Sequence, residues 1–187
     1  MENEQTDLYS TSTRELIITA FLNLLASIQF KKITVRQIVN KAGISRSTFY
    51  LHFEDKYDLI SGITEELVEG FMLFYTQPVL ATTTSYNLPK DGISSNTFKI
   101  CEHIKINKSF YKDRFQDKEF VALFTKRIGT ELEKNLEDPE FAAFAAFGTV
   151  GYIAKWLEDD LETSVDDFAK NLSTIGNAIM SRYQVHP

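Results

Sequence analysis

The sequence predicts an all-α fold, in which an N-terminal three-helix helix-turn-helix domain is followed by a C-terminal helical bundle. Apolar residues recur at helical spacing along most of the 187 residues. No stretch alternates between apolar and polar residues as a half-buried strand does, and no hairpin turn pair or internal repeat is present. With 43% hydrophobic and 25% charged residues, the chain can bury the cores of one or two small domains.

The N-terminal domain is predicted over residues 12–57, after a disordered tail over 1–11. Its helices are expected at about 13–25, 35–42, 46–53 and 55–77. Four residues have the side chains or backbone freedom that begin or end such helices: Thr34, Gly43, Ser45 and Asp55. Gly43 can adopt the left-handed conformation cheaply, so it suits the turn between the second and third helices.

The C-terminal domain is predicted over residues 58–187. Two prolines, a glycine and many hydroxyl residues make 78–94 the best loop candidate. Helices are expected beyond it at 96–105, 108–116, 118–136, 140–159 and 165–183. Their predicted N-caps are Asn107, Asp117, Asp138 and Ser164.

Charge is unevenly distributed in this acidic chain. The formal net charge is −6, but the segment 31–56 holds six basic and only two acidic residues. A local basic face on an acidic body is typical of a nucleic-acid reader with a separate regulatory part. Chance clustering of surface lysines would give the same count, so charge alone leaves both interpretations open.

Composition also narrows the compartment and the chemistry. Cys101 is the single cysteine, so no internal disulfide can form and a reducing cytoplasm is expected. No signal peptide or membrane-spanning stretch is recognisable, and no membrane association is expected. The three histidines are scattered and His103, beside Glu102, is expected in a surface pair. We therefore predict no metal site and no cofactor.

The segment 33–59, ITVRQIVNKAGISRSTFYLHFEDKYDL, carries the functional information. A helix, a four-residue turn with a glycine and an apolar residue, and a second helix have helix-turn-helix spacing. A major groove about 12 Å wide admits one helix, which must present polar groups outward and an apolar underside inward. Phe49 and Phe53 suit that underside and are assigned to the core.

This segment resembles the DNA-binding region of the TetR/AcrR family of transcriptional regulators. Thirteen residues stand where the family pattern places them: Thr34, Ile38, Ala42, Gly43, Ile44, Ser45, Thr48, Phe49, Tyr50, His52, Phe53, Lys56 and Leu59. The resemblance implies a homodimer that binds a double-stranded DNA operator. It is expected to act as a repressor of transcription that a small apolar effector releases from its palindromic site.

The resemblance also assigns roles to residues. The implied DNA contacts are Thr34, Arg36, Ser45, Arg46, Ser47, Thr48, Tyr50, His52 and Lys56. Arg46 is the expected base reader, because its planar fork matches two acceptors of guanine. Thr34 and Arg36 open a helix where a phosphate can bind, and Lys56 resembles a phosphate clamp. Packing of Tyr50 or His52, and simple solvation of the charges, are the alternatives.

Two further groups of residues are predicted in the C-terminal half. A ligand cavity could be lined by Phe98, Cys101, Phe110, Tyr111, Phe115, Phe120 and Phe124, although such residues are more often packed core. The dimer interface is expected to include Phe144, Phe147, Gly151, Ile153, Trp156, Phe168, Leu172, Ile175 and Ile179. Small residues among these aromatics permit close helix approach, but the same aromatics could be monomer core.

Other functions are less well supported by the residues. No nucleophile–base pair, glycine-rich phosphate loop or recognisable carboxylate pair is present, so an enzyme is not expected. A protein-binding module that acts through a partner remains the main alternative to direct operator binding. The acidic C-terminal half is compatible with that alternative.

Overall fold

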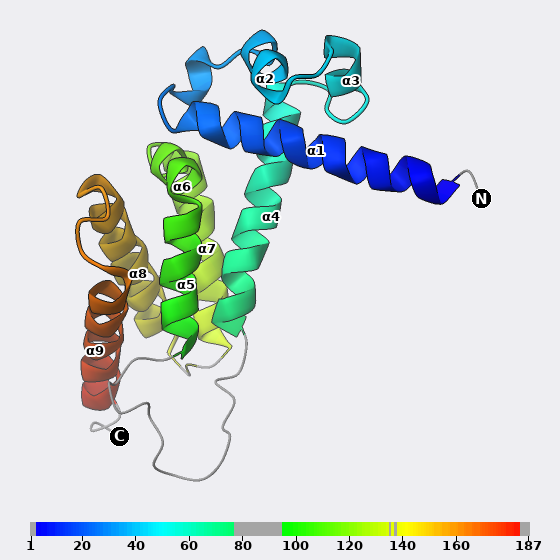
Figure 1. Ribbon diagram of the computed structural model, residues 1–187. Coiled ribbons are helices and arrows are strands. Elements are labelled where there is room, and N and C mark those ends of the chain that lie inside the picture. The colour runs from blue at the N-terminus through cyan, green and yellow to red at the C-terminus, as the bar shows by residue number, and fades with distance from the viewer. Residues whose placement is uncertain (1–2, 77–94, 135, 137, 184–187) are drawn as a thin grey trace. The chain divides into compact units, whose positions relative to one another are not determined.

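The computed structural model describes the backbone of residues 3–76, 95–134, 136 and 138–183, and the side chains of 13–75, 96–134, 136 and 138–178. Every regular element in these ranges is helical (Figure 1). The loop predicted over 78–94 lies outside the described residues. No helix in the described part is long and apolar enough to cross a membrane.

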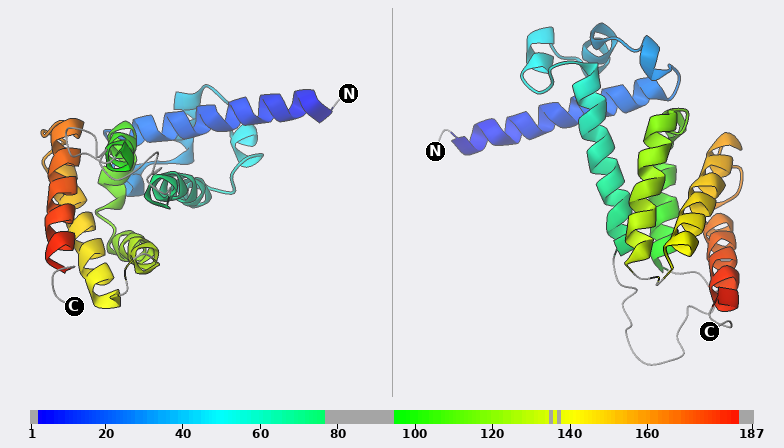
Figure 2. Two further views of the ribbon diagram at one scale, coloured as in Figure 1. Left: turned by 90° about the horizontal axis from the view of Figure 1, so that it is seen from below. Right: turned by 180° about the vertical axis from the view of Figure 1, so that it is seen from behind.

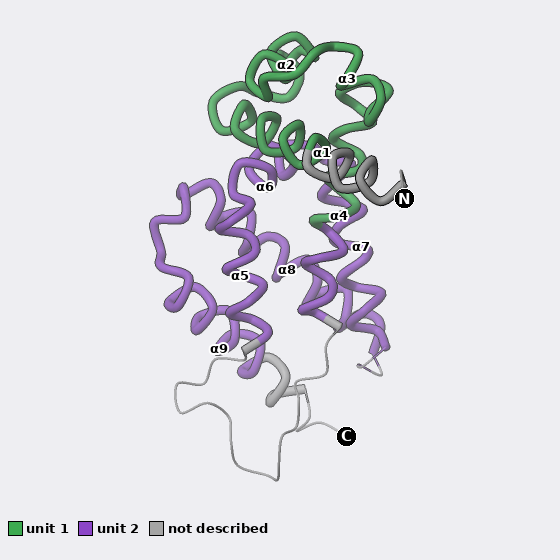
Figure 3. Tube along the Cα trace, turned by 45° about the vertical axis from the view of Figure 1, so that its right-hand side comes forward, with its two compact units in different colours: residues 1–67 green, residues 68–187 purple. Residues whose placement is uncertain are grey.

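The described chain divides into two compact units, residues 1–67 and 68–187 (Figure 3). The division falls within α4, whereas the sequence predicts a domain boundary between residues 57 and 58. The helices in chain order are α1 (Asn3–Leu25), the 3-10 turn η1 (Phe30–Lys32), α2 (Val35–Ala42), α3 (Arg46–Tyr50) and α4 (Lys56–Thr76). They continue with α5 (Ser95–Ile106), α6 (Lys108–Arg114), α7 (Lys118–Glu133), α8 (Pro139–Glu158) and α9 (Val165–Tyr183).

Unit 1 forms around a small apolar core to which each of its helices contributes. α1 packs against α2, and α2 against α3. The fully buried side chains are Ile17, Phe21, Ile33, Ile38, Phe49, Leu59 and Ile63. This core places α2 and α3 at fixed positions, so the outward faces of the two helices are held rigidly.

Two helices of unit 1 differ in length from the expectation. α1 begins at Asn3, so helical backbone covers most of the range predicted as a tail. No proline or glycine interrupts that range, and acidic residues near a helix start are favoured by the helix dipole. α3 ends at Tyr50 rather than residue 53. The chain must leave the helix there, because Asp55 accepts hydrogen bonds from the Tyr57 and Asp58 amides and caps α4.

The remaining predicted caps are confirmed with one exception. Asp117, Asp138 and Ser164 accept hydrogen bonds from amides in the first turns of α7, α8 and α9. Asn107 makes no such bond before α6. Its side-chain amide instead donates to the carbonyl of His103 at 2.9 Å, so it serves the end of α5.

Unit 2 is a helical bundle in which α7 packs along α8 and α5 along α9 (Figure 2). Its core holds large aromatic and branched side chains. The least exposed of these include Phe71, Ile104, Phe110, Tyr111, Ile128 and Ile153. The α8–α9 connection contains two residues with positive φ, Asp160 at 56° and Leu161 at 62°.

Candidate DNA-binding site

The start of α2 is organised by a reciprocal cap between Thr34 and Gln37. The Thr34 hydroxyl oxygen accepts from the Gln37 amide at 3.3 Å, and the Gln37 side-chain oxygen accepts from the Thr34 amide at 2.9 Å. The Thr34 hydroxyl also donates to the Gln37 side-chain oxygen, so its proton is engaged within the cap. The first amides of a helix have no intrahelical acceptor, which leaves this helix start able to bind an anion.

Gly43 sets the turn between α2 and α3. Its φ of 70° and ψ of 30° are left-handed, and its amide donates to the Val39 carbonyl. A methyl group added at Gly43 would meet no atom within 4 Å. The conformation, rather than lack of space, therefore requires glycine here.

Hydroxyl groups at the start of α3 are bonded to one another. The Ser45 oxygen lies 2.7 Å from the hydroxyls of Ser47 and Thr48, and it accepts from the Thr48 amide at 3.0 Å. Ser45 thus caps α3, as the sequence predicts. The three residues form one small polar cluster at the end of α3 from which base readers are expected to project.

The outward face of α3 is exposed over four residues: Arg46, Ser47, Tyr50 and Leu51. Phe49 is fully buried on the opposite side, and Phe53 is 6% exposed. Both phenylalanines therefore belong to the core, as expected. Within the described residues, the Arg46 guanidinium forms no bond to another protein group, and neither does that of exposed Arg36. These two cations are available to an external partner.

Tyr50 and His52 differ in their exposure. Tyr50 is 55% exposed, although its ring also meets the edge of Phe49 at 5.5 Å. His52 is half-buried, with its ring 6.5 Å from that of Phe53. Tyr50 is thus more accessible to a partner than His52.

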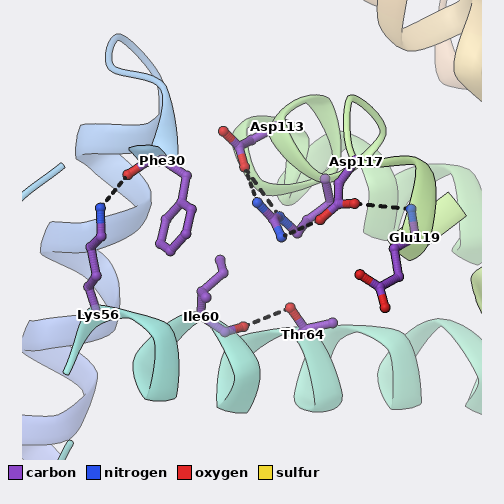
Figure 4. A network of polar contacts seen from close by, with 8 residues as sticks. Phe30, Lys56, Ile60, Thr64, Asp113, Asp117 and Glu119 are labelled. Atoms are coloured by element: carbon purple, nitrogen blue, oxygen red, sulfur yellow. Dashed lines mark hydrogen bonds and ion pairs between the residues drawn. The ribbon is translucent and has the colours of Figure 1, made fainter. Parts of the chain in front are cut away.

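Lys56 is engaged within unit 1. Its ammonium donates to the carbonyl oxygen of Phe30 at 3.1 Å (Figure 4). It also donates to the carbonyl oxygens of Lys31 at 3.1 Å and Ile33 at 2.8 Å. It also lies 4.7 Å from the Phe30 ring centroid. An ammonium has three N–H donors, so these carbonyls use all of them. The predicted phosphate contact of Lys56 would require exchange of at least one of these bonds.

Arg14 and Leu51 are two relevant residues that the sequence analysis does not single out. Arg14 of α1 pairs with Glu66 of α4, and its guanidinium lies 5.7 Å from the centroid of Phe53. It thereby ties the long helices of unit 1 together. Leu51 is 83% exposed beside Tyr50. Its spacing of four residues from Ser47 could have indicated that it shares the outward face of α3.

Five of the seven predicted cavity residues, all of them aromatic, form a cluster in unit 2. Phe120 stacks on Phe124 at 5.5 Å, and Tyr111 approaches Phe115 at 6.3 Å and Phe124 at 6.4 Å. Phe110 meets Phe120 edge-on at 6.1 Å. The other two predicted residues are Cys101, which is fully buried, and Phe98, which is half-buried. These rings fill the space between them, so the cluster is packed in this structure.

His103, predicted to form a surface pair with Glu102, is half-buried and contacts a buried tyrosine. Its Nε2 lies 3.0 Å from the hydroxyl of Tyr111, which is fully buried. A methyl group added at Gly70 would lie 3.1 Å from His103 Cε1. Gly70 therefore provides the room for the imidazole. Burial raises the pKa of the Tyr111 hydroxyl well above its ordinary value.

A surface hollow of about 450 Å³ lies elsewhere in unit 2. Met72 and Leu123 form apolar parts of its lining, and Lys126, Arg127 and Lys134 contribute positive charge. None of the predicted cavity residues lines it. Among the described residues no cluster of three potential metal ligands is present.

The predicted dimer residues separate into two groups. Phe144 and Phe147 are 64% and 70% exposed, and Ile175 is 46% exposed. Gly151 is also exposed, whereas Leu172 is half-buried. The side chain of Ile179 lies outside the described residues.

Three residues that the sequence predicts at the dimer interface lie instead in the core of unit 2. Ile153, Trp156 and Phe168 are at most 2% exposed. The Trp156 and Phe168 rings stack with centroids 4.0 Å apart, and the Trp156 indole N–H donates to the Thr163 carbonyl at 2.9 Å. These contacts occupy the faces that a second copy would need.

Family comparisons match the chain in two segments. The family described as "Bacterial regulatory proteins, tetR family" matches residues 17–63. The family described as "Transcriptional regulator C-terminal region" matches residues 91–178. The first match includes the whole of α2 and α3, with the capped helix-turn-helix described above.

Individual proteins show the same similarity at low identity. The chain is 24% identical over 163 residues to the HTH-type regulator YxbF of Bacillus subtilis (strain 168), covering 82% of this chain and 42% of YxbF. It is 27% identical over 136 residues to DhaS, the dhaKLM operon transcriptional activator of Lactococcus lactis, covering 70% of this chain and 64% of DhaS. These alignments span less than two thirds of either relative.

Solved structures share the fold. The dihydroxyacetone kinase operon activator DhaS superposes with a TM-score of 0.63 at 19% identity, over 92% of this chain and 97% of that one. A TerR/AcrR-family regulator from Aquifex aeolicus gives a TM-score of 0.66 at 18% identity, over 89% of this chain and 99% of that one. The helical architecture is therefore common to these proteins and this chain.

Proposed function

The chain belongs to the TetR/AcrR family of DNA-binding transcriptional regulators, and from this premise we propose how it acts. Two copies bind a palindromic operator and repress transcription, and a small apolar effector releases them. The observation that carries the proposal is the outward face of α3, where Arg46, Ser47 and Tyr50 are exposed above a fully buried Phe49. A helix with a polar outward face and a buried underside suits insertion into a major groove.

Base recognition is assigned to Arg46, and backbone contacts to the residues around it. The guanidinium of Arg46 can donate two hydrogen bonds to the O6 and N7 acceptors of guanine. The start of α2, with exposed Thr34 and Arg36, can hold a phosphate. Tyr50 can donate its hydroxyl proton to a second phosphate. Ser45, Ser47 and Thr48 support this arrangement through their shared hydrogen bonds.

A homodimer is proposed because palindromic DNA matches a two-fold protein. Exposed Phe144, Phe147 and Gly151 are spaced by three and four residues and so share one face of α8, which combines apolar side chains with a close-approach position. Ile175 is an exposed apolar residue of α9. Exposed apolar patches of this kind mark interaction surfaces. Half-site recognition then requires the two α3 helices to meet grooves about 34–36 Å apart, or a related fixed spacing.

Effector release is proposed to act through the aromatic cluster of unit 2. Its rings touch one another, so an apolar effector must separate them to bind. Half-buried Phe115 is the member of the cluster nearest to solvent. An effector that fits only the opened cluster would favour a second conformation by its differential affinity.

The first test is selection of bound fragments from sheared genomic DNA of the source organism. The expected result is enrichment of one palindromic sequence by the full chain. Arg46→Ala should bind that sequence more weakly by about 1–3 kcal/mol and should relax base preference at one position per half-site. Lys41→Ala, which removes another exposed basic side chain of unit 1, is the matched control. Failure to enrich any sequence at low salt would contradict the proposal.

The direction of regulation is tested separately, because the relative DhaS is named as an activator. Repression is proposed because it requires only occupancy of the operator, without a further surface for the transcription machinery. A reporter placed behind the selected operator should therefore be less active when the protein is present. Increased reporter activity would support activation and would leave operator binding itself unaffected.

A further inference from the structure

Leu51 is the most exposed large hydrophobic residue in the described chain. Its side chain is 83% exposed, directly after the five-residue helix α3. Full burial of a leucine side chain is worth about 1.5–3 kcal/mol, so an exposed leucine retains apolar surface that a partner can cover. The roles assigned above to Arg46, Ser47 and Tyr50 do not use it.

Backbone hydrogen bonding fixes where Leu51 lies relative to the reading face. The Leu51 amide donates to the Ser47 carbonyl at 3.2 Å, so the helical turn continues to Leu51. Residues four apart in a helix share a face, which places Leu51 beside Ser47 and Arg46 beside Tyr50. Phe49 is buried on the opposite side. Leu51 therefore extends the polar reading face with one apolar side chain.

The length of α3 brings both ends of the helix within reach of DNA. At 1.5 Å per residue, five residues span about 7.5 Å. A major groove is about 12 Å wide, which exceeds that length. When α3 enters the groove, the side chains at its start can reach base edges. The side chain that follows its last residue can reach them too.

The chemistry of the groove selects one group for Leu51. Base edges in the major groove carry hydrogen-bond donors and acceptors, and their apolar group is the 5-methyl of thymine. A leucine side chain has no hydrogen-bonding group, so it cannot form a hydrogen bond with a base donor, a base acceptor or a phosphate. We propose that Leu51 packs against the methyl group of a thymine, so that one position in each operator half-site is read as thymine. This inference rests on the proposed binding of α3 to the operator.

The test removes one methyl group at a time from the DNA. In the operator recovered by selection, each thymine is replaced singly by deoxyuridine, which keeps the hydrogen-bonding edge. Loss of one buried methyl-sized group is worth about 0.8 kcal/mol. At 1.4 kcal/mol for a tenfold change, this is about fourfold in affinity for one half-site. We expect this loss at one thymine position per half-site for the unchanged protein.

Variants of the protein show whether Leu51 is responsible. Leu51→Ala should bind the thymine operator more weakly and should bind the thymine and deoxyuridine forms equally. Arg46→Ala should weaken binding but keep the preference for the methyl group. Leu123→Ala, which shortens a leucine that is 63% exposed in unit 2, should behave as the unchanged protein. Thermal unfolding verifies that each variant is folded. We expect Leu51→Ala to fold, because the side chain that it shortens is exposed.

The outcomes separate this inference from the function on which it rests. Operator binding that is insensitive to every deoxyuridine overturns the thymine contact and leaves the regulator proposal standing. A methyl preference that persists in Leu51→Ala assigns the contact to another residue and overturns the role of Leu51. Absence of any selected operator contradicts operator binding, and the role of Leu51 falls with it.

Discussion

The ammonium of Lys56 donates a hydrogen bond of 2.8 Å to the carbonyl oxygen of Ile33, across 23 residues of sequence. Two further carbonyls, those of Phe30 and Lys31, accept the other protons of the same group. The start of α4 is thereby tied to the connection between α1 and α2. This arrangement assigns Lys56 a positioning role within unit 1.

Lys56→Met should lower the free energy of unfolding by about 1–3 kcal/mol, because three carbonyls, two of them in part-buried hydrogen bonds, lose a charged donor. Urea unfolding of the full chain measures this loss. Lys41→Met, which removes an exposed ammonium from the same unit, should leave stability unchanged. We expect the salt dependence of operator binding to be the same for folded Lys56→Met as for the unchanged protein. A slope reduced by about one phosphate contact would instead support the clamp predicted from the sequence.

Phe147→Glu should convert the proposed dimer into a monomer. The side chain is 70% exposed, and a carboxylate placed there would be desolvated at an apolar interface. Light scattering should report 21.4 kDa for the variant and twice that mass for the unchanged chain. Leu123→Glu changes a leucine of similar exposure on another helix and should stay dimeric. A dimeric Phe147→Glu variant would place the interface elsewhere. A monomeric unchanged chain would contradict the proposed dimer.

Asp160→Asn tests the contacts between α6 and the α8–α9 connection. Lys112 and Lys108 bond the Asp160 carboxylate at 2.7 and 2.9 Å and lower its pKa from 3.8 to about 2. Because the pKa of Asp160 is lower in the folded state, its ionised carboxylate stabilises the fold at pH values above its ordinary pKa of 3.8. This stability is lost as the pH falls toward about 2. Asparagine tolerates the positive φ of 56° and removes only the charge.

Thermal unfolding as a function of pH measures this contribution. The unchanged protein should be more stable than Asp160→Asn at neutral pH, and the difference should shrink between pH 3.8 and about 2. Asp166→Asn removes another exposed carboxylate of unit 2 and is the matched control. A difference that stays constant through this interval would show that the two lysines do not hold the ionised carboxylate in solution.

Phe124→Ala should destabilise unit 2 by about 3–5 kcal/mol, the usual cost of removing a large buried ring. Phe124 is 2% exposed, stacks on Phe120 and meets Phe71 edge-on at 4.8 Å. Urea unfolding measures the loss, and Leu123→Ala should change stability by no more than about 0.5 kcal/mol. Benzene should raise the unfolding temperature of Phe124→Ala by filling the new space. A small loss without benzene stabilisation would mean that the cluster already contains a cavity.

Local interactions explain which parts of the fold and site could be predicted from sequence. The caps by Thr34, Ser45 and Asp55 bond amides at most three residues away, and Gly43 bonds an amide to a carbonyl four residues back. Interactions over so few residues are visible as short patterns. The range of α2 and the buried positions of Phe49 and Phe53 agree with those patterns for the same reason.

Short-range patterns of residues predict the helical class, the capped helix-turn-helix and the cations that suit DNA. Which apolar residues remain available to partners depends on tertiary packing. Phe147 and Trp156 lie on the same helix, yet one is 70% exposed and the other 2%, because the ring of Phe168 stacks on Trp156. The carbonyl partners of Lys56 lie 23 to 26 residues away along the chain. Helical spacing marks a face as apolar or charged, but only the packing of distant segments determines what meets that face.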